Sequence, residues 1–236
     1  MEGQRVVDRR TDPPLLQVGL QRVAAGNPDG VLIVDGLVRR VDVRQSAGGR
    51  WPYASTAVLS PEAGGGVLLD FGVHLFDLLL WWLGDIGVAR YADDAAGGIE
   101  TECEGELRLQ NGAPVQVEFS RTRQLRDTVI VEGERGTVEI GVFEPAVVRL
   151  SLPGGGPTLA GSVADAEFAR APLPTVFGRQ LADVVRAIRG GPPPLVGGTD
   201  GRRAVALVES CYARRTPLRR PWDFPEAYAA VGRAGP

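Results

Sequence analysis

A long apolar run, AGGGVLLDFGVHLFDLLLWWLG at residues 63–84, constrains the fold more than any other stretch of this sequence. It is too long for one strand, contains no proline and is bounded by glycine at both ends, so it predicts a helix. A helix that is apolar on nearly every side is buried in a protein core or in a membrane. The rest of the chain is therefore expected to pack around residues 63–84.

Three ionisable side chains, Asp70, His74 and Asp77, interrupt this run, and His74 is the one histidine among the 236 residues. Positions i, i+4 and i+7 fall on one stripe of an α-helix, so the three side chains should share a face. Carboxylates beside an imidazole in a partly buried setting have coupled, shifted pKa values, which suits general acid–base catalysis. The stripe predicts Asp70 and His74 as a catalytic pair, with Asp77 as a substrate-binding position.

Two other interpretations of the stripe stay open. A single histidine on an apolar helix is more often a satisfied core residue than a catalyst. The spacing Asp-x3-His-x2-Asp also offers metal ligands, but the sequence has no second histidine and no paired cysteines to complete a nitrogen or sulfur site. We therefore expect no metal.

Composition and charge exclude several classes of protein. A hydrophobic fraction of 44% and a charged fraction of 23% are typical of a soluble globular protein. A net charge of −3 without a basic block argues against nucleic acid as a partner. The N-terminus lacks an apolar signal-peptide core, and Leu75–Leu83 is too short to cross a bilayer, so we expect a cytoplasmic protein without membrane contact. Two distant cysteines, Cys103 and Cys211, are expected to be reduced thiols.

Short strands with tight turns surround the central helix. Asn111-Gly112 is a strong hairpin signal and residues 133–136 form another plausible turn, which predicts antiparallel neighbours. Polar residues alternate with apolar ones, so one sheet face should pack on helices while the other is wet or contacts another subunit. The expected strands are 15–20, 37–45, 88–92, 105–110, 114–121, 127–133, 136–141 and 146–152.

Amphipathic helices are predicted at residues 177–189 and 199–214. With the strands they predict an α+β fold, a large, mainly antiparallel, open-faced sheet with helices packed on one face. The domain limits that we expect are an N-terminal segment, one domain and a C-terminal tail, at 1–14, 15–220 and 221–236.

A long irregular segment at residues 46–66 separates the first predicted strand of the sheet from the central helix. Long loops with aromatic residues in compact domains are often functional, although plain loop packing is an equal alternative. Trp51 and Tyr53, with Arg50 beside them, are therefore candidates for binding substrate at the mouth of a pocket.

The central run resembles a signature of the Gfo/Idh/MocA family of NAD(P)-dependent oxidoreductases. GGGVLLDFGVHLFDLLLWWLGD looks like the GGG-x-x-x-D-x-G-x-H-x-x-D helix of that family's C-terminal domain, and LQVGLQRV, DGLVRRVDVR, LQNGAPVQVEFS, VIVEGERGTVEI and DGRRAVALVESCYA lie around it in the family's order. The resemblance covers about residues 15–215. It implies that Asp70 orients a substrate hydroxyl and that His74 takes its proton. It also implies a homodimer or tetramer through the open sheet face.

Other parts of the family's pattern are missing from this sequence. The family carries an N-terminal Rossmann domain with a G-x-G-x-x-G loop, and too few residues precede position 15 for one βαβ unit. Gly64–Gly66 is not such a loop, because no strand–loop–helix unit with a later ribose-binding acid surrounds it. The family's Glu-Lys-Pro motif is absent, and all 26 basic residues are arginine. We therefore expect the C-terminal domain alone, without a cofactor.

Three functions from different classes fit these observations. The first is a cofactor-independent acid–base catalyst of isomerase, dehydratase, lyase or cyclase type, acting on a small molecule, with natural-product biosynthesis as a plausible setting. The second is the substrate-binding subunit of a split NAD(P)-dependent oxidoreductase, which docks a separate nucleotide-binding subunit. The third is a non-catalytic binding or oligomerisation module. Buried ionisable groups are costly unless they are paired or useful, which argues against the third.

Overall fold

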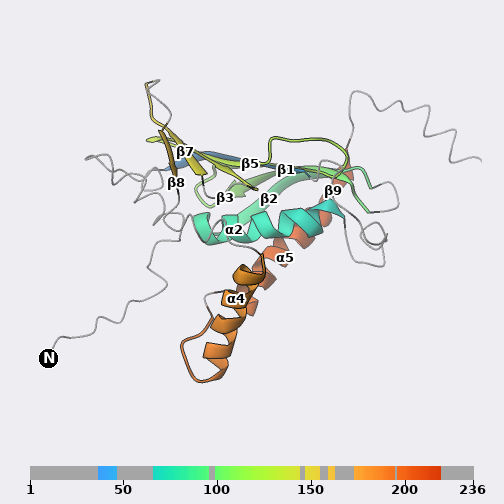
Figure 1. The fold of residues 1–236 in the computed structure, drawn as a ribbon. Helices are drawn as coiled ribbons and strands as arrows, with labels where there is room; N and C mark the ends of the chain where they lie inside the picture. The colour runs from blue at the N-terminus through green and yellow to red at the C-terminus, as the bar shows by residue number, and fades with distance from the viewer. Residues whose placement is uncertain are drawn as a thin grey trace, which may run out of the picture.

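A mixed sheet with helices on one face makes up most of the chain that the structure describes (Figure 1). The structure is a computed structural model, and it describes residues 37–46, 66–95, 99–143, 147–154, 159–162, 173–194 and 196–218. The elements in chain order are β1 (Val38–Ser46), the π-helical turn η4 (Leu68–Gly72), α2 (Val73–Leu83), β2 (Ile86–Asp93), β3 (Glu102–Leu109), β4 (Pro114–Ser120), β5 (Thr128–Gly133), β6 (Gly136–Gly141), β7 (Val147–Ser151), β8 (Leu159–Ser162), α4 (Leu173–Ile188), α5 (Gly198–Tyr212) and β9 (Arg215–Pro217).

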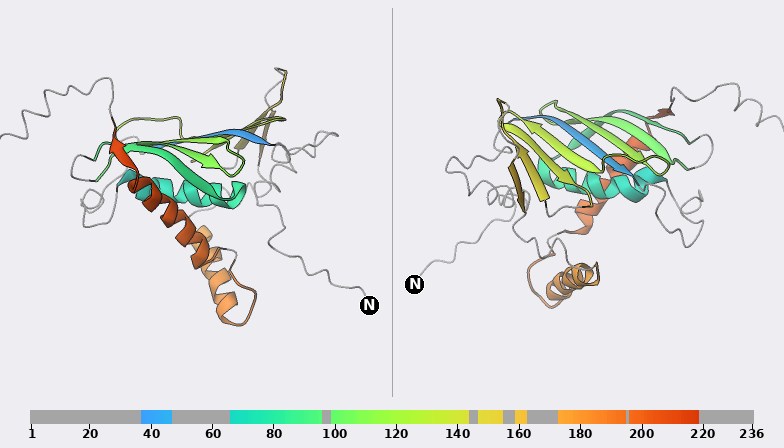
Figure 2. Two further views of the ribbon diagram at one scale, coloured as in Figure 1. Left: turned by 180° about the vertical axis from the view of Figure 1, so that it is seen from behind. Right: turned by 45° about the horizontal axis from the view of Figure 1, so that its top comes forward.

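The sheet contains nine described strands in the order β8-β7-β6-β5-β1-β4-β3-β2-β9. β1 pairs in parallel with β4, and β2 with β9, while every other pairing is antiparallel. Figure 2 shows the strands side by side, with α2 and α5 behind them. The predicted α+β fold with an open-faced, mainly antiparallel sheet is thus confirmed.

Two short strands differ from the sequence-based prediction. β8 lies in a glycine- and proline-rich segment that predicts a loop, and β9 lies just after α5, where the sequence predicts a helix end and a tail. β9 forms because Thr216 and its neighbours pair with the end of β2, a contact that no local pattern signals. The predicted strand at 15–20, and the domain limits at 1–14 and 221–236, fall outside the described residues.

The apolar side of α2 packs directly on the sheet. Phe76 is fully buried and meets Phe119 of β4 edge-on, with ring centroids 6.1 Å apart. Gly72 permits this close approach, since a Cβ there would lie 2.6 Å from Leu68 Cδ1 and 3.1 Å from Phe119 Cε2. Next to α2, on the same side of the sheet, α5 buries one apolar stripe in this core. The stripe is made of Ala204, Leu207, Val208 and Cys211. None of the helices in the described part of the chain combines the length and apolarity needed to cross a bilayer.

Glu100 anchors the start of the central helix. The backbone N–H of Val67 donates to the Glu100 carbonyl oxygen at 3.0 Å, and the N–H of Leu68 donates to Glu100 Oε1 at 3.1 Å. The Tyr212 hydroxyl, from the last turn of α5, donates to the same Oε1 at 2.8 Å. Gly66 lies so close that a Cβ would be 2.2 Å from the Glu100 carbonyl oxygen. The third glycine of the run is therefore required by packing against Glu100.

The helix does not start as the regular α-helix that the sequence predicts. Leu68–Gly72 forms a π-turn, in which the N–H of Val73 donates to the Leu68 carbonyl, and regular α-helix begins at Val73. Single π-turns inside α-helices are frequent at functional sites. This turn contains Asp70 and leads directly to His74.

Candidate functional site

Asp70 is held by a buried arginine that the sequence does not single out. Arg121 Nη2 donates to Asp70 Oδ2 at 2.8 Å. The Arg121 side chain is 4% exposed, whereas that of Asp70 is 45% exposed. The guanidinium also lies over the Phe71 ring, 5.5 Å from its centroid. The buried arginine thus fixes a carboxylate whose outer half remains free to contact a ligand.

The parallel pairing of β1 with β4 explains why Arg121 lies at this place. Ser46, at the end of β1, is in register with Ser120, at the end of β4, and Arg121 follows immediately. The loop predicted to carry the pocket mouth leaves the sheet at Ser46 and rejoins the described chain at Gly66, before the Asp70 turn. The three candidate residues of that loop lie outside the described residues: Arg50, Trp51 and Tyr53.

His74 lies in the first turn of α2 and is exposed. Asp77 is half-buried, and its pKa is raised by burial and by the nearby Asp200 carboxylate, while His74 and Arg203 act in the opposite direction. The structure therefore brings His74 and Asp77 within electrostatic reach of each other. No hydrogen bond or ion pair joins Asp70 to His74 among the described contacts.

The expectation that the stripe is buried needs correction. Asp70 and His74 are exposed and only Asp77 is partly buried, because the apolar side chains around them supply the buried side of the helix. The cost of burying a charge therefore does not argue for function at Asp70 and His74. The arginine that fixes Asp70 is the stronger indication.

A hydrogen-bonded network around Glu102 holds the turn that presents Arg121. The Ser120 and Thr122 hydroxyls donate to Glu102 Oε1, and Arg123 Nε donates to Glu102 Oε2 at 2.8 Å. Burial alone would raise the pKa of Glu102, but the bonds from Arg123, Ser120 and Thr122 outweigh it and hold that pKa below its ordinary value. The polar sequence SRTR at the end of an apolar strand was the signal that could have identified this turn.

The glycine-bounded start of the central helix does not fit a dinucleotide. A pyrophosphate binds free N–H groups at a helix N-terminus that begins with a glycine loop. Here the N–H groups of Val67 and Leu68 already donate to Glu100, and the space beside Gly66 is filled by the Glu100 carboxylate, which would repel an anion. No three potential metal ligands gather among the residues that the structure describes.

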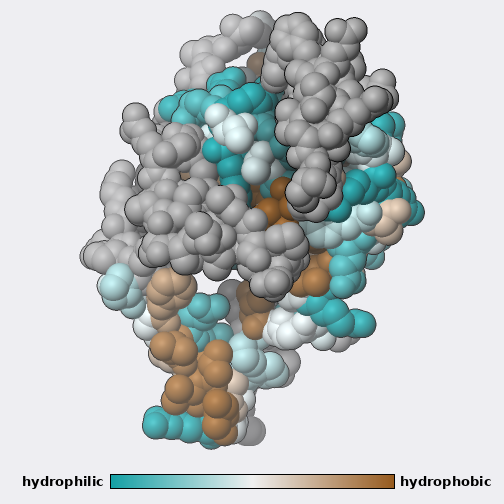
Figure 3. Space-filling view, turned by 90° about the vertical axis from the view of Figure 1, so that its right-hand side faces the viewer, coloured by the Kyte–Doolittle hydropathy of each residue, from teal (hydrophilic) through white to brown (hydrophobic). Residues whose placement is uncertain are grey.

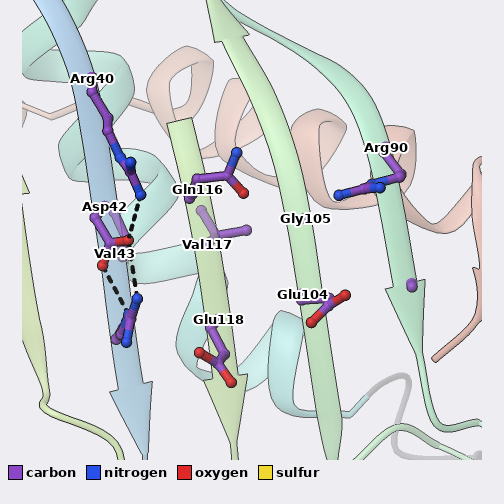
Figure 4. Close-up of a pocket in the computed structure, with 11 residues that line it drawn as sticks. Arg40, Asp42, Val43, Arg90, Glu104, Gly105, Gln116, Val117 and Glu118 are labelled. Atoms are coloured by element: carbon purple, nitrogen blue, oxygen red, sulfur yellow. Dashed lines mark hydrogen bonds and ion pairs between the residues drawn. The ribbon is translucent and has the colours of Figure 1, made fainter. Parts of the chain in front are cut away.

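Two surface hollows lie away from these residues. One, of about 280 Å³, lies on the open sheet face and is lined by charged side chains of β1 to β4 (Figure 4). The other, of about 470 Å³, lies beside β5, β6 and β7. Neither is lined by Asp70, His74 or Asp77. Asp70 and His74 are thus exposed outside both hollows.

Comparison with known proteins identifies relatives of this fold. Residues 36–139 match the model of the GFO/IDH/MocA C-terminal domain. The chain is 31% identical over 147 residues to a 1,5-anhydro-D-fructose reductase from Ensifer adhaerens, covering 60% of this chain and 42% of the reductase. It is thus similar to less than half of that protein.

Solved structures with the same fold include a 3-ketoreductase from Actinomadura kijaniata in complex with NADP and TDP-benzene, with a TM-score of 0.64 and 19% identity over 88% of this chain and 62% of the ketoreductase. The WlbA dehydrogenase from Bordetella pertussis, in complex with NADH and UDP-GlcNAcA, has a TM-score of 0.61 and 20% identity, covering 84% of this chain and 59% of the dehydrogenase.

At these identities the solved structures support the fold alone, and in each case the chain spans less than two thirds of the relative. The match to the family model contains the residues that carry the resemblance in the sequence, from β1 through the Asp70–His74 helix to β6. Residues 36–139 of this chain therefore match part of the C-terminal domain of the Gfo/Idh/MocA family.

Proposed function

We propose that this chain is the substrate-binding part of an oxidoreductase whose nucleotide is carried by a second protein body. The observation that carries the proposal is the Asp70–Arg121 pair, a carboxylate fixed from below by a buried guanidinium and exposed beside His74. Acid–base groups act most effectively where water is excluded. Because Asp70 and His74 are both exposed, we assign their enclosure to a second body.

The relatives support a sugar or a sugar-like alcohol or ketone as the substrate. The curated relative is a reductase of 1,5-anhydro-D-fructose, and the solved relatives include a 3-ketoreductase and a dehydrogenase bound to UDP-GlcNAcA. Both solved relatives hold a nicotinamide nucleotide. Since the start of the central helix in this chain does not fit one, we assign the nucleotide to another body.

His74 moves the proton in this proposal. It accepts the proton of a substrate hydroxyl in the direction of oxidation and returns it to the oxygen in the direction of reduction. Asp70 accepts a hydrogen bond from a substrate hydroxyl and so orients it, while Arg121 keeps Asp70 in place. Asp77 contacts His74 electrostatically, and its remaining surface is available to a substrate.

The cofactor-independent reactions expected from the sequence have less support. The three relatives described above are two reductases and a dehydrogenase, so they lend no support to isomerase, dehydratase, lyase or cyclase activity. Nor do the described residues enclose Asp70 and His74, as a catalyst without a partner would require. We place the reaction in the cytoplasm, where free thiols such as Cys103 and Cys211 persist.

A fusion enzyme tests this function. The part of the Actinomadura kijaniata 3-ketoreductase that this chain does not match is joined by a flexible linker to the full 236-residue chain, and NADPH consumption is followed with 1,5-anhydro-D-fructose and a panel of keto sugars. We expect turnover that falls about 100-fold or more in His74→Ala, the usual contribution of a general acid–base group. The control is Glu134→Gln, which changes an exposed carboxylate in the β5–β6 turn, paired with Arg39, and should keep full turnover. Absence of turnover with every sugar, or full turnover in His74→Ala, would contradict the proposal.

We also propose that the open sheet face joins copies of this chain as a homodimer or tetramer. Arginine and acidic side chains are interspersed on this face (Figure 4), and Asp42 of β1 forms ion pairs with both Arg40 and Arg44. A twofold axis lying between two such faces, parallel to both sheets, would set the arginines of one copy against the acids of the other. Sedimentation should show a salt-sensitive oligomer that Arg90→Glu weakens, while Arg135→Glu, in the β5–β6 turn, leaves it intact. A monomer at every protein concentration would refute this arrangement.

A further inference from the structure

One side of α4 exposes a row of large apolar side chains, which we name the α4 face. Leu181 is 65% exposed and Ile188 is 78% exposed, far more than core residues of this size. The spacing of four, three and four residues places the members on one side of the helix. Figure 3 shows a hydrophobic patch on the part of the molecule that projects from the body. The α4 face comprises Phe177, Leu181, Val184, Val185 and Ile188.

The charged residues of α4 lie on the opposite side of the helix. Arg179, Asp183 and Arg186 are spaced by four and three residues, and Arg186 Nη2 forms an ion pair with Asp183 Oδ1. Helices of this pattern normally bury their apolar side against a neighbour. Here that side is exposed over about 17 Å of helix, so an apolar patch is left without cover in the described structure.

The position of α4 restricts what can cover it. α4 lies on the helical side of the sheet, below α2 and α5, while the open sheet face points the other way (Figures 1 and 2). Asp70 and His74 are exposed on α2 and on the turn before it, on this same helical side. One protein body seated against α4 can therefore also cover Asp70 and His74, whereas a copy docked on the open sheet face cannot.

We propose that the α4 face is the docking surface for the nucleotide-binding body, which meets it with an apolar surface. This inference rests on the proposed function. The 3-ketoreductase and the WlbA dehydrogenase have 38% and 41% of their chains beyond the part that matches, so each carries a further segment to which the nucleotide-binding body corresponds in this proposal. A second copy fits less well, because α4 offers only two heptads, fewer than the three or four of a self-pairing coiled coil.

Hydrogen exchange in the fusion protein tests the docking independently of turnover. Amides of α4 should exchange about tenfold more slowly in the fusion than in the 236-residue chain, because the docked body prevents the helix from opening. Leu181→Asp should abolish this protection, since it places a charge in the centre of the α4 face. Ala182→Asp introduces the same group at the next residue, which is exposed but lies outside the α4 face, and this variant should keep the protection.

The variants also show what the α4 face does in the chain alone. Leu181→Asp should leave the melting temperature of the 236-residue chain unchanged, since Leu181 is exposed there. A large loss would mean that this face packs within the chain, and would overturn the proposal. Equal α4 exchange in fusion and chain would overturn it as well, even if the fusion turns over. A dimer of the chain that Leu181→Asp dissociates would identify a second copy as the occupant instead. Slowed exchange without turnover would support docking and refute the proposed function.

Discussion

Arg121 and Asp70 form an ion pair whose members differ in exposure, since the guanidinium is buried and the carboxylate is half exposed. The pair joins the end of β4 to the π-turn, two segments 51 residues apart in the sequence. A carboxylate fixed on one side and free on the other can orient a ligand without first paying the entropy of its own ordering. We therefore propose that Arg121 acts as a positioning residue through Asp70.

Replacing Arg121 should separate function from stability. Arg121→Met keeps the buried volume and leaves Asp70 partly hydrated, so no charge becomes buried without a partner, and the melting temperature should fall by no more than a few degrees. Turnover of the fusion should fall about 10- to 100-fold, because Asp70 is no longer held in place. Arg121→Lys should recover part of this loss.

The control for this prediction is Arg108→Met, which removes an exposed arginine paired with Glu106 on the open sheet face. The kcat of the fusion and the melting temperature are compared for Arg121→Met, Arg121→Lys and Arg108→Met. Wild-type kcat in Arg121→Met would show that the ion pair has no role in positioning. A collapse in stability without a change in kcat per folded molecule would show that the pair is structural.

Gly66 is expected to tolerate no side chain. Alanine there would place its Cβ 2.2 Å from the Glu100 carbonyl oxygen, so the backbone that starts the helix must move. We expect the free energy of unfolding to drop by about 2 kcal/mol or more, as in other overpacked sites. Gly87→Ala in β2, with no atom within 4 Å of the new Cβ, should change it by no more than about 0.5 kcal/mol. Urea denaturation of both variants gives the answer, and equal stability would contradict the packing described for Glu100.

The sequence predicted the fold well where the signals are local. The glycine-bounded apolar run identified the central helix, and the Asn111-Gly112 turn identified the β3–β4 hairpin. Both signals act over a few residues, through helix length and turn geometry. β9 was missed because three exposed residues acquire strand structure only by pairing with β2.

The site was predicted only in part, because its supporting residues come from distant segments. The spacing in one helix predicts Asp70 and His74 as site residues, and that assignment stays a prediction. Arg121, Glu100 and Glu102 come to the helix or to the turn beside it through tertiary contacts. The parallel pairing of β1 with β4 brings these segments together. The central helix lies between the two strands in the sequence, so no hairpin signal reveals the pairing. The π-turn was also invisible, since i, i+4 spacing assumes a regular α-helix.

Glu102 should make the free energy of unfolding depend on pH in the acidic range. Its pKa is lowered in the folded state, so the folded protein favours the ionised carboxylate. The stabilisation is complete above the ordinary glutamate pKa of about 4.3 and is lost as the pH falls through the lower folded value. Glu102→Gln should therefore be less stable than wild type at pH 7, and this difference should shrink below about pH 4.

The measurement is urea denaturation of wild type and Glu102→Gln between pH 7 and pH 3. Glu134→Gln is a suitable control, because Glu134 is exposed and forms only a long ion pair, with 3.8 Å between its Oε1 atom and Arg39 Nη2. Its difference from wild type should stay small at every pH, as is usual for exposed ion pairs. A difference for Glu102→Gln that grows in acid would mean that this carboxyl is protonated in the folded protein.

The two cysteines should be unreactive while the protein is folded. Both are buried free thiols, and burial raises the pKa of Cys103 well above its usual value and that of Cys211 to about 12. At pH 8 neither is a thiolate, which is the form that attacks a disulfide reagent. Titration with Ellman's reagent should detect no thiol in the native protein and two after denaturation in guanidinium. Rapid reaction of one thiol in the native state would show that α5, which carries Cys211, or β3, which carries Cys103, opens away from the core.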